Sequence, residues 1–359
     1  MVSQLALHFN PGDARSTLER ERQSAWNEAM TRRRKLLIGL AGLPLLAAAL
    51  YLVGPRRVVD TRLPDLRLPA QLPALERAIA TREAALSDIT SGCAATLAWQ
   101  GAPRTRTPLS LVYLHGFSAT RQETAPLTER LAAALGANRF EARLRGHGRG
   151  GPPLGAAKAE EWLADGAEAL EVGRRIGERV VVIAVSTGGS LATWLLTHGY
   201  DERIAALVLI SPNFGPRHPA ASLMAGPWGA QITRLVAGEE RGFQPHNELQ
   251  ARYWTWRYPS QVLVEMQALV ELAKASDPRQ LRVPLLTIRS PRDQVLDPAP
   301  MAAFHQAAAS QPKLQIDYEQ SGDPSQHVLA GDVLSPESTE PLGARILEFL
   351  RPLVGEGRP

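Results

Sequence analysis

The feature that most constrains this chain is an apolar run that ends abruptly in a serine. The run V-V-V-I-A-V occupies positions 180–185, Ser186 follows it, and small residues come next in T-G-G-S. A second run, A-L-V-L-I at 206–210, is also almost continuous in apolar residues. Strands read this way when both faces of a parallel sheet are covered. The first run therefore predicts a fully buried strand that leads directly into a helix.

The same alternation of strand and helix recurs along most of the chain. Strands are predicted at 94–99, 109–114, 139–144, 180–185, 205–211, 284–289 and 314–319. Helices are predicted at 123–135, 158–176, 188–198, 298–309 and 340–354. Such alternation is typical of an α/β fold, with a mostly parallel sheet and helices on both of its faces.

One interval, at about 213–280, interrupts this rhythm. It contains no convincing strand pattern and is rich in aromatic residues, among them Trp254 and Trp256. We interpret it as a helical cap over the carboxyl ends of the strands, where open α/β sheets bind their ligands. The two tryptophans are candidates for an apolar lid or acyl pocket, and they could equally pack the cap onto the main domain.

The N-terminal region carries a candidate membrane segment. The basic sequence R-R-R-K at 32–35 precedes 18 uncharged residues at 36–53, which as a helix would span roughly 27 Å, close to the apolar thickness of a bilayer. A buried core helix and a cleaved signal peptide are the alternatives, but the A-x-A sequence at 47–49 lies inside the apolar run. We therefore expect an uncleaved anchor at 36–54.

Basic residues predict the orientation of this anchor. Seven Lys or Arg residues lie up to Lys35, and four lie between Arg56 and Arg67. The positive-inside rule then places residues 1–35 in the cytoplasm and the main domain on the periplasmic or extracellular side. Met30 could also be the true start of the protein. Residues 55–92 are expected to form a proline-rich linker with a short helix at 74–88, before the main domain at 93–355.

Charge and cysteine content exclude two function classes. Residues 1–70 hold 11 Lys or Arg and 6 Asp or Glu, whereas the other 289 residues hold 29 and 30. The basic excess thus belongs to the N-terminal region, which argues against a nucleic-acid partner for the main domain. Cys93 is the single cysteine, so neither an intrachain disulfide nor a thiolate metal site can form, and we interpret it as a buried small residue.

Ser186 is a candidate nucleophile. The sequence A-V-S-T-G at 184–188 is typical of a nucleophile elbow in which Ala184 replaces the first glycine. The turn between strand and helix is sharp, so the residues two before and two after the serine must be small. The strand at 109–114 ends in His115-Gly116, and the loop that follows could present the N–H of Phe117, together with that of Thr187, to a developing oxyanion.

An acid and a histidine follow in the order that such sites use. Asp293 comes just after the strand at 284–289, and Asp297 is the competing acid, although it precedes Pro298 and could cap the next helix. His327 lies in a loop after the last predicted strand. We predict that Ser186 attacks a carbonyl carbon, His327 takes its proton and Asp293 orients the imidazole. His305 falls inside a predicted helix and is interpreted as a surface residue.

Several of these motifs together resemble the α/β-hydrolase superfamily, and most of all the serine hydrolases of the carboxylesterase, lysophospholipase and monoacylglycerol-lipase group. The matching segments are L-H-G-F-S (114–118), R-L-R-G-H-G (143–148), A-V-S-T-G-G (184–189), S-P-R-D (290–293) and Q-H-V (326–328).

The resemblance implies a serine ester hydrolase with no metal or organic cofactor, in which His147 shapes a turn. The membrane segment favours acyl lipid esters as substrates. Acyl transfer, thioester or peptide cleavage by the same triad, and a catalytically silent binding protein, are the alternatives.

Overall fold

The structure is a computed structural model that describes residues 11–102 and 104–354. The chain divides into two compact units, Met1–Pro55 and Arg56–Pro359, which are described separately.

The first unit is one helix, α1 (Pro11–Val53), which continues through Pro44. Its segment Leu18–Val53 contains an 18-residue window with a mean hydropathy of 2.4, of which 0% is buried. By length and composition this helix could cross a membrane. It begins well before the expected anchor at 36–54, because the polar residues in front of that anchor are helical too.

The second unit is built on a seven-stranded sheet, within the described residues, in the order β1-β3-β2-β4-β5-β8-β9. Only the pair β1 and β3 is antiparallel. The bounds are β1 (Thr96–Ala98), β2 (Thr107–Leu114), β3 (Asn138–Glu141), β4 (Gly177–Val185), β5 (Ile204–Ile210), β8 (Leu285–Arg289) and β9 (Lys313–Asp317). All seven predicted strands of the main sheet are therefore confirmed, with small differences at their ends.

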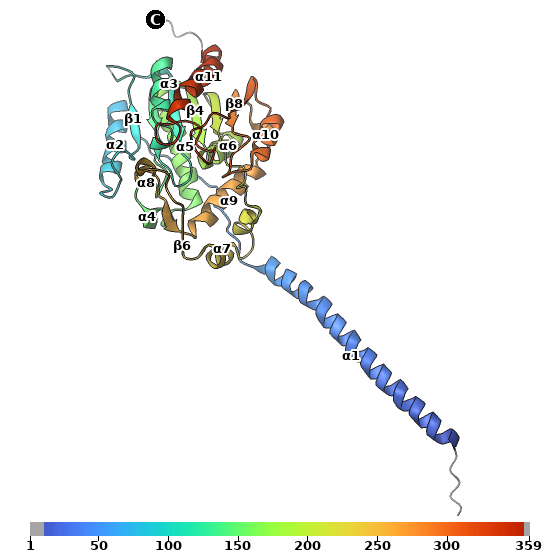
Figure 1. Cartoon of the computed structure of the whole chain (residues 1–359). Coiled ribbons are helices and arrows are strands. Elements are labelled where there is room, and N and C mark those ends of the chain that lie inside the picture. Colours follow the sequence, from blue (N-terminus) through green and yellow to red (C-terminus); the bar gives the residue numbers. More distant parts are fainter. Residues whose placement is uncertain (1–10, 103, 355–359) are drawn as a thin grey trace, which may run out of the picture. The chain divides into compact units, whose positions relative to one another are not determined.

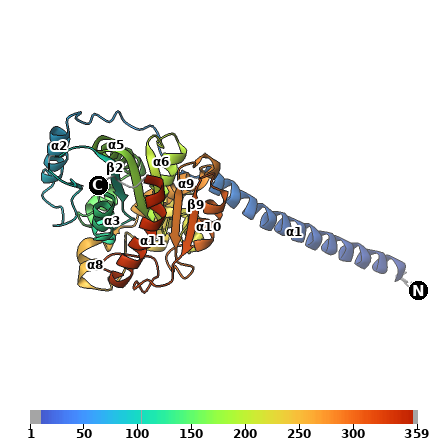
Figure 2. The same ribbon diagram turned by 90° about the horizontal axis from the view of Figure 1, so that it is seen from above.

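Helices cover both faces of this sheet, as predicted. Figure 2 shows α5 and α6 on one side of β2, and α3 and α11 on the other. The helices of the second unit outside the predicted cap are α2 (Leu72–Ala84), α3 (Leu127–Leu135), α4 (Gly151–Ala156), α5 (Ala159–Ile176), α6 (Thr187–Thr197), α10 (Pro298–Ala307) and α11 (Pro336–Val354). The 3-10 turn η1 (Arg121–Glu123) also lies outside it, and η3 (Pro278–Gln280) lies at its end.

Strand β4 shows how the sequence fills both faces. Its side chains alternate, so Val182 joins the cluster beneath α5 and α6, whereas Ile183 joins the cluster beneath α3 and α11. Both residues are fully buried. Because each face of the strand meets a helical layer, the run has to be apolar throughout rather than at every second position.

The expected cap is smaller than the interval 213–280, and it contains strands. Its elements are η2 (Pro219–Met224), α7 (Gly229–Ala237), β6 (Glu240–Gly242), α8 (Glu248–Tyr253), β7 (Arg257–Pro259) and α9 (Val262–Ala275). Strands β6 and β7, with α8 between them in sequence, pair as a small two-stranded antiparallel sheet, contrary to the prediction. Helix α9 packs against α6, and its buried residues Val262, Met266, Leu269 and Ala273 belong to the main core, so the last part of the interval is packed on the main domain (Figure 1).

The expected linker at 55–92 is part of the folded unit. Leu63, Leu66 and Leu68 pack against the main core, and helix α2 buries Leu75 in it. The guanidinium of Arg57 donates to Glu265 of α9 at 2.8 Å. Pro64, between two of these leucines, and Pro69, after the third, therefore belong to an extended segment that lies on the domain, rather than to a spacer. Cys93 is buried, as expected.

Candidate active site

Ser186 occupies the sharp junction between β4 and α6. Its backbone has φ 51° and ψ −119°, outside the regions that L-residues ordinarily adopt. Neighbouring backbone holds it there, because the Ser186 N–H donates to Ile210 O at 3.0 Å and Asn213 N–H donates to Ser186 O at 2.9 Å. Strain of this kind costs about 1–3 kcal/mol and persists where the surroundings impose it.

The small residues around Ser186 have a steric reason. A Cβ at Gly188 would lie 2.3 Å from the carbonyl oxygen of Leu114, so any side chain there would collide with β2. Ala184 sits two residues before the serine and its methyl group is fully buried in the core. The departure from glycine at this position therefore fits within the packed junction.

The three residues predicted as a triad meet at the carboxyl edge of the sheet. His327 Nε2 lies 3.1 Å from Ser186 Oγ, and His327 Nδ1 lies 2.8 Å from Asp293 Oδ2. All three side chains are buried. Burial opposes the charged imidazole, but the attraction and hydrogen bond of Asp293 outweigh it and raise the pKa of His327 above its usual 6.5.

The structure also separates the two competing acids. Asp293 Oδ1 accepts the backbone N–H groups of Val295 at 2.8 Å and Leu296 at 2.9 Å, which leaves Oδ2 aimed at the histidine. Asp297 instead caps helix α10 through the Ala299 N–H at 2.9 Å. The proline that follows Asp297 was the sequence signal for this difference.

The loop after β2 approaches Ser186, and both residues expected to supply oxyanion donors, Phe117 and Thr187, line the same cavity as the serine. A Cβ at Gly116 would lie 3.1 Å from Ser186 Cβ, which shows how closely the loop approaches. The Gly116 carbonyl accepts from His115 Nδ1 at 2.9 Å, and His115 Nε2 accepts from the Leu144 N–H at 3.1 Å. Within the described residues, the N–H groups of Phe117 and Thr187 have no hydrogen-bond partner.

A cavity of about 660 Å³ opens over these groups. Ser186, His327 and Thr187 line it together with apolar cap residues, among them Leu223, Met224, Ile232, Val236, Phe243 and Trp254. Trp254 is thus in the cavity wall, where it also packs against Val328 beside the histidine. Trp256 is not among the lining residues and is 41% exposed; its carbonyl accepts the Phe243 N–H at 3.0 Å, next to the paired strands β6 and β7.

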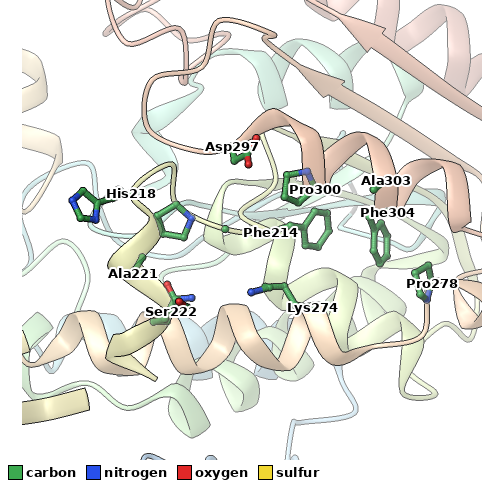
Figure 3. A pocket seen from close by; sticks show the side chains of 13 residues that line it. Phe214, His218, Ala221, Ser222, Lys274, Pro278, Asp297, Pro300, Ala303 and Phe304 are labelled. Carbon is green, nitrogen blue, oxygen red and sulfur yellow. The ribbon is translucent and has the colours of Figure 1, made fainter. Parts of the chain in front are cut away.

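A second cavity of about 510 Å³ lies between α9, α10 and the segment around residue 216. Figure 3 shows its apolar wall of Phe214, Pro300 and Phe304, with Asp297 at one end and Lys274 at the other. The three triad residues do not line it, although Pro216, His218 and Ala221 border both cavities.

Other buried titratable groups of the second unit include His147, His305 and Glu123. His147 is buried against Trp162 and its Nδ1 contacts the Arg145 carbonyl, in agreement with a structural role. The surface interpretation of His305 is wrong, because it is buried and its Nδ1 lies 2.9 Å from Thr287 Oγ1. Glu123, which was expected at the start of a helix, is buried behind the oxyanion loop and lines the first cavity.

Sequence reasoning attached no function to Glu123. The available signal was a carboxylate seven residues after Gly116, at the start of the helix predicted at 123–135, whereas α3 begins only at Leu127. Among residues 11–102 and 104–354, no group of three or more His, Cys, Asp or Glu side chains could hold a metal ion.

The parallel sheet, the strained serine at the end of β4 and the order Ser, Asp, His define an α/β-hydrolase. The chain belongs to the family described as serine aminopeptidase, S33, whose profile matches residues 106–322, more than half of the chain. Among curated proteins the comparison found no match.

Solved structures of related fold include several enzymes of lipid and ester metabolism. One comes from work on LipS and LipT, two metagenome-derived lipolytic enzymes, with 22% identity, a TM-score of 0.61 and coverage of 74% of this chain and 99% of that one. The monoacylglycerol lipase of Paleococcus ferrophilus shows 16% identity, a TM-score of 0.54 and coverage of 72% and 97%. A soluble variant of the Saccharomyces cerevisiae monoglyceride lipase, bound to a substrate analogue, shows 10% identity, a TM-score of 0.54 and coverage of 72% and 91%. At these identities the likeness shows the fold.

Proposed function

We propose that this chain is a membrane-anchored serine hydrolase that cleaves carboxylic esters of acyl lipids. The observation that carries the proposal is the continuous contact from Ser186 Oγ to His327 Nε2 and from His327 Nδ1 to Asp293 Oδ2, at 3.1 and 2.8 Å. A serine hydroxyl is a weak nucleophile and becomes reactive only beside a base that is itself oriented. Here both partners are in place without further movement.

The reaction follows from these contacts. Ser186 Oγ attacks the ester carbonyl while its proton passes to His327 Nε2, and the carbonyl oxygen becomes an oxyanion facing the N–H groups of Phe117 and Thr187. His327 then gives the proton to the departing alcohol, which leaves an acyl group on Ser186. Water enters, loses a proton to His327 and releases the carboxylic acid. Asp293 holds the imidazole and stabilises its charged form throughout.

Two features support an acyl lipid as the substrate. The cavity above Ser186 is lined by aliphatic and aromatic cap residues, Trp254 included, which suits a long hydrocarbon chain better than a charged group. Helix α1 is long and apolar enough to hold the chain at a bilayer, where acyl lipids reside. The excess of basic residues before the apolar segment supports a catalytic domain on the outer side of that membrane.

Peptide cleavage is the second candidate, because the family carries the description of a serine aminopeptidase. An aminopeptidase needs an acceptor for the free amino group of its substrate. Glu123 and Asp323 line the cavity, but Glu123 accepts from Gly116 N and Tyr113 Oη, and Asp323 accepts from three backbone N–H groups. Because protein donors already engage both carboxyl groups, the cavity favours an ester without a free amine.

Active-site labelling and a substrate panel test this proposal. The full chain in detergent should react with a fluorophosphonate probe, and Ser186→Ala should abolish labelling while leaving the melting temperature unchanged. A series of p-nitrophenyl esters from C2 to C16, beside aminoacyl-p-nitroanilides, then assigns the bond and the chain length. Folded protein that neither labels nor cleaves any ester, or that cleaves only the anilides, would refute the proposal.

A further inference from the structure

Glu123 is a buried carboxyl group that the reaction steps above do not use. It is the last residue of η1, it is only 2% exposed, and its Oε2 accepts the Gly116 N–H at 2.8 Å and the Tyr113 hydroxyl at 3.0 Å. Burial raises its pKa above the usual value, against the stabilising effect of these donors and of nearby His327. Burying a carboxyl group costs free energy unless hydrogen bonds compensate, so the contacts that Glu123 makes bear on its role.

The carboxyl group of Glu123 lies close to Ser186, the proposed nucleophile. A Cβ at Gly116 would lie 2.7 Å from Glu123 Oε1 and 3.1 Å from Ser186 Cβ, so the acid and the serine both border the space that a side chain at position 116 would fill. Glu123 also lines the catalytic cavity. The backbone of Glu123 is held in turn, because its N–H donates to Thr120 O at 2.9 Å.

The contacts fix both peptide groups that flank Gly116. Glu123 holds the N–H on one side. On the other side the Gly116 carbonyl accepts from His115 Nδ1 at 2.9 Å and from the Ala119 N–H at 3.3 Å. Burial lowers the pKa of His115 to about 4, so this ring is neutral at pH 7 and keeps its one proton on Nδ1. Because a trans peptide is planar, fixing the Gly116 carbonyl also fixes the opposite direction of the Phe117 N–H.

We propose that Glu123 is a positioning residue, whose carboxyl group holds the Gly116 peptide so that the Phe117 N–H points at the oxyanion. The inference rests on the proposed serine-hydrolase function. Glycine at 116 gives the loop its close approach to Ser186, but it also leaves the backbone free to rotate. The carboxyl group of Glu123 removes that freedom at the Gly116 N–H, and His115 removes it at the Gly116 carbonyl. Preorganised donors stabilise a transition state because they need no reorientation when charge develops.

Three substitutions separate this role from simple structural support. Glu123→Met keeps the length of the side chain but removes the acceptor. Glu123→Gln keeps an acceptor oxygen for the Gly116 N–H and removes the charge. Tyr113→Phe is the matched control, because it removes the other hydrogen bond to the same carboxyl oxygen without touching Gly116.

Steady-state kinetics on a p-nitrophenyl ester give the first measurement. We expect Glu123→Met to lower kcat by about 30- to 100-fold with KM within about threefold, since a misplaced donor typically costs up to about 10²-fold. Glu123→Gln should keep kcat within about threefold of the wild type. Tyr113→Phe should lose thermal stability and keep kcat within about twofold.

A transition-state analogue gives a second measurement that a structural role would not affect. A trifluoromethyl ketone forms an oxyanion adduct with the serine, so Glu123→Met should weaken its inhibition by the same factor as kcat, whereas the carboxylate product should bind as in the wild type. If Glu123→Met does not fold, Glu123→Asp, which is one methylene shorter, replaces it with an expected loss of about tenfold in kcat.

Either of two results would overturn the inference. The first is an unchanged kcat in folded Glu123→Met or Glu123→Asp. The second is an equal loss of kcat in Glu123→Gln and Glu123→Met, because the cause would then be the lost charge rather than the lost positioning. An inactive wild type would instead refute the proposed function.

Discussion

The carboxyl edge of the sheet and the cap above it are built in different ways. At the edge, Ser186, Asp293 and His327 are buried and hydrogen-bonded to one another. In the cap, helix α7 exposes Leu235 at 86% and Val236 at 80%, and the neighbouring strands are three residues long. Under the proposed function, we expect the edge to carry the chemical step and the cap to select the substrate. Substitutions at the edge should change kcat, and substitutions in the cap should change KM.

The largest expected effect is that of Asp293→Asn. The amide oxygen can still accept from Val295 and Leu296, so the loop keeps its shape. The amide N–H₂ would face His327 Nδ1 and favour the tautomer with its proton on Nε2, which cannot take a proton from Ser186. We expect kcat for a p-nitrophenyl ester to fall by about 10⁴-fold, with little change in KM.

Asp297→Asn is the matched control for this prediction. Asparagine is also a good helix N-cap, so α10 should keep its first turn and the variant should retain wild-type kcat and melting temperature. A large loss of kcat in Asp297→Asn, with kcat preserved in Asp293→Asn, would mean that Asp297 rather than Asp293 is the acid that orients His327.

A smaller effect is expected in the cap from Ile232→Ala. Ile232 lines the catalytic cavity, whereas Leu235 on the same helix points away from it and is exposed. Removing contacts worth about two methylene groups, at about 0.8 kcal/mol each, should raise KM for a C12 ester about tenfold. The kcat for a C2 ester should stay within about twofold, because the edge is untouched.

Leu235→Ala, which makes the same kind of change on the exposed side of α7, should leave both kinetic constants unchanged. Equal increases of KM in the two variants would mean that the cap acts through its stability rather than through contact with the acyl chain. A fall of kcat for the short ester in Ile232→Ala would remove the distinction between edge and cap.

The same contrast governs what the sequence alone could predict. The sheet and the residues at its edge follow from local patterns: an apolar run predicts β4, a proline after Asp297 predicts a cap, and the motif order predicts which residues face each other. These patterns succeed because each position has a single steric or hydrogen-bonding demand, such as the absence of space for a Cβ at Gly188.

In other segments the sequence pattern was ambiguous, because contacts with residues distant in the sequence decide where the side chains lie. The leucines at 63, 66 and 68 read as part of a proline-rich spacer, yet they pack on the core, and Arg57 reaches Glu265 about two hundred positions away. Trp254 and Trp256 have equal aromatic character, yet only Trp254 lines the cavity, and strands β6 and β7 beside Trp256 are too short to give a periodic signal. Glu123 carried no motif of its own.

The smallest expected effect concerns the pH dependence of the edge. His327 must be neutral to accept the proton from Ser186, and Asp293 raises its pKa above 6.5 despite burial. Activity should therefore be lost as pH falls through a value above 6.5, since the protonated form is inactive. In a profile of kcat/KM for a C2 ester from pH 5 to 9, which reports the free enzyme, we expect a slope of one on the acid side. Preincubation at each pH controls for unfolding. A midpoint below 6.5 would mean that burial, rather than Asp293, has the larger effect on the pKa of His327. The contact between Asp293 and His327 would then be weaker than its geometry indicates.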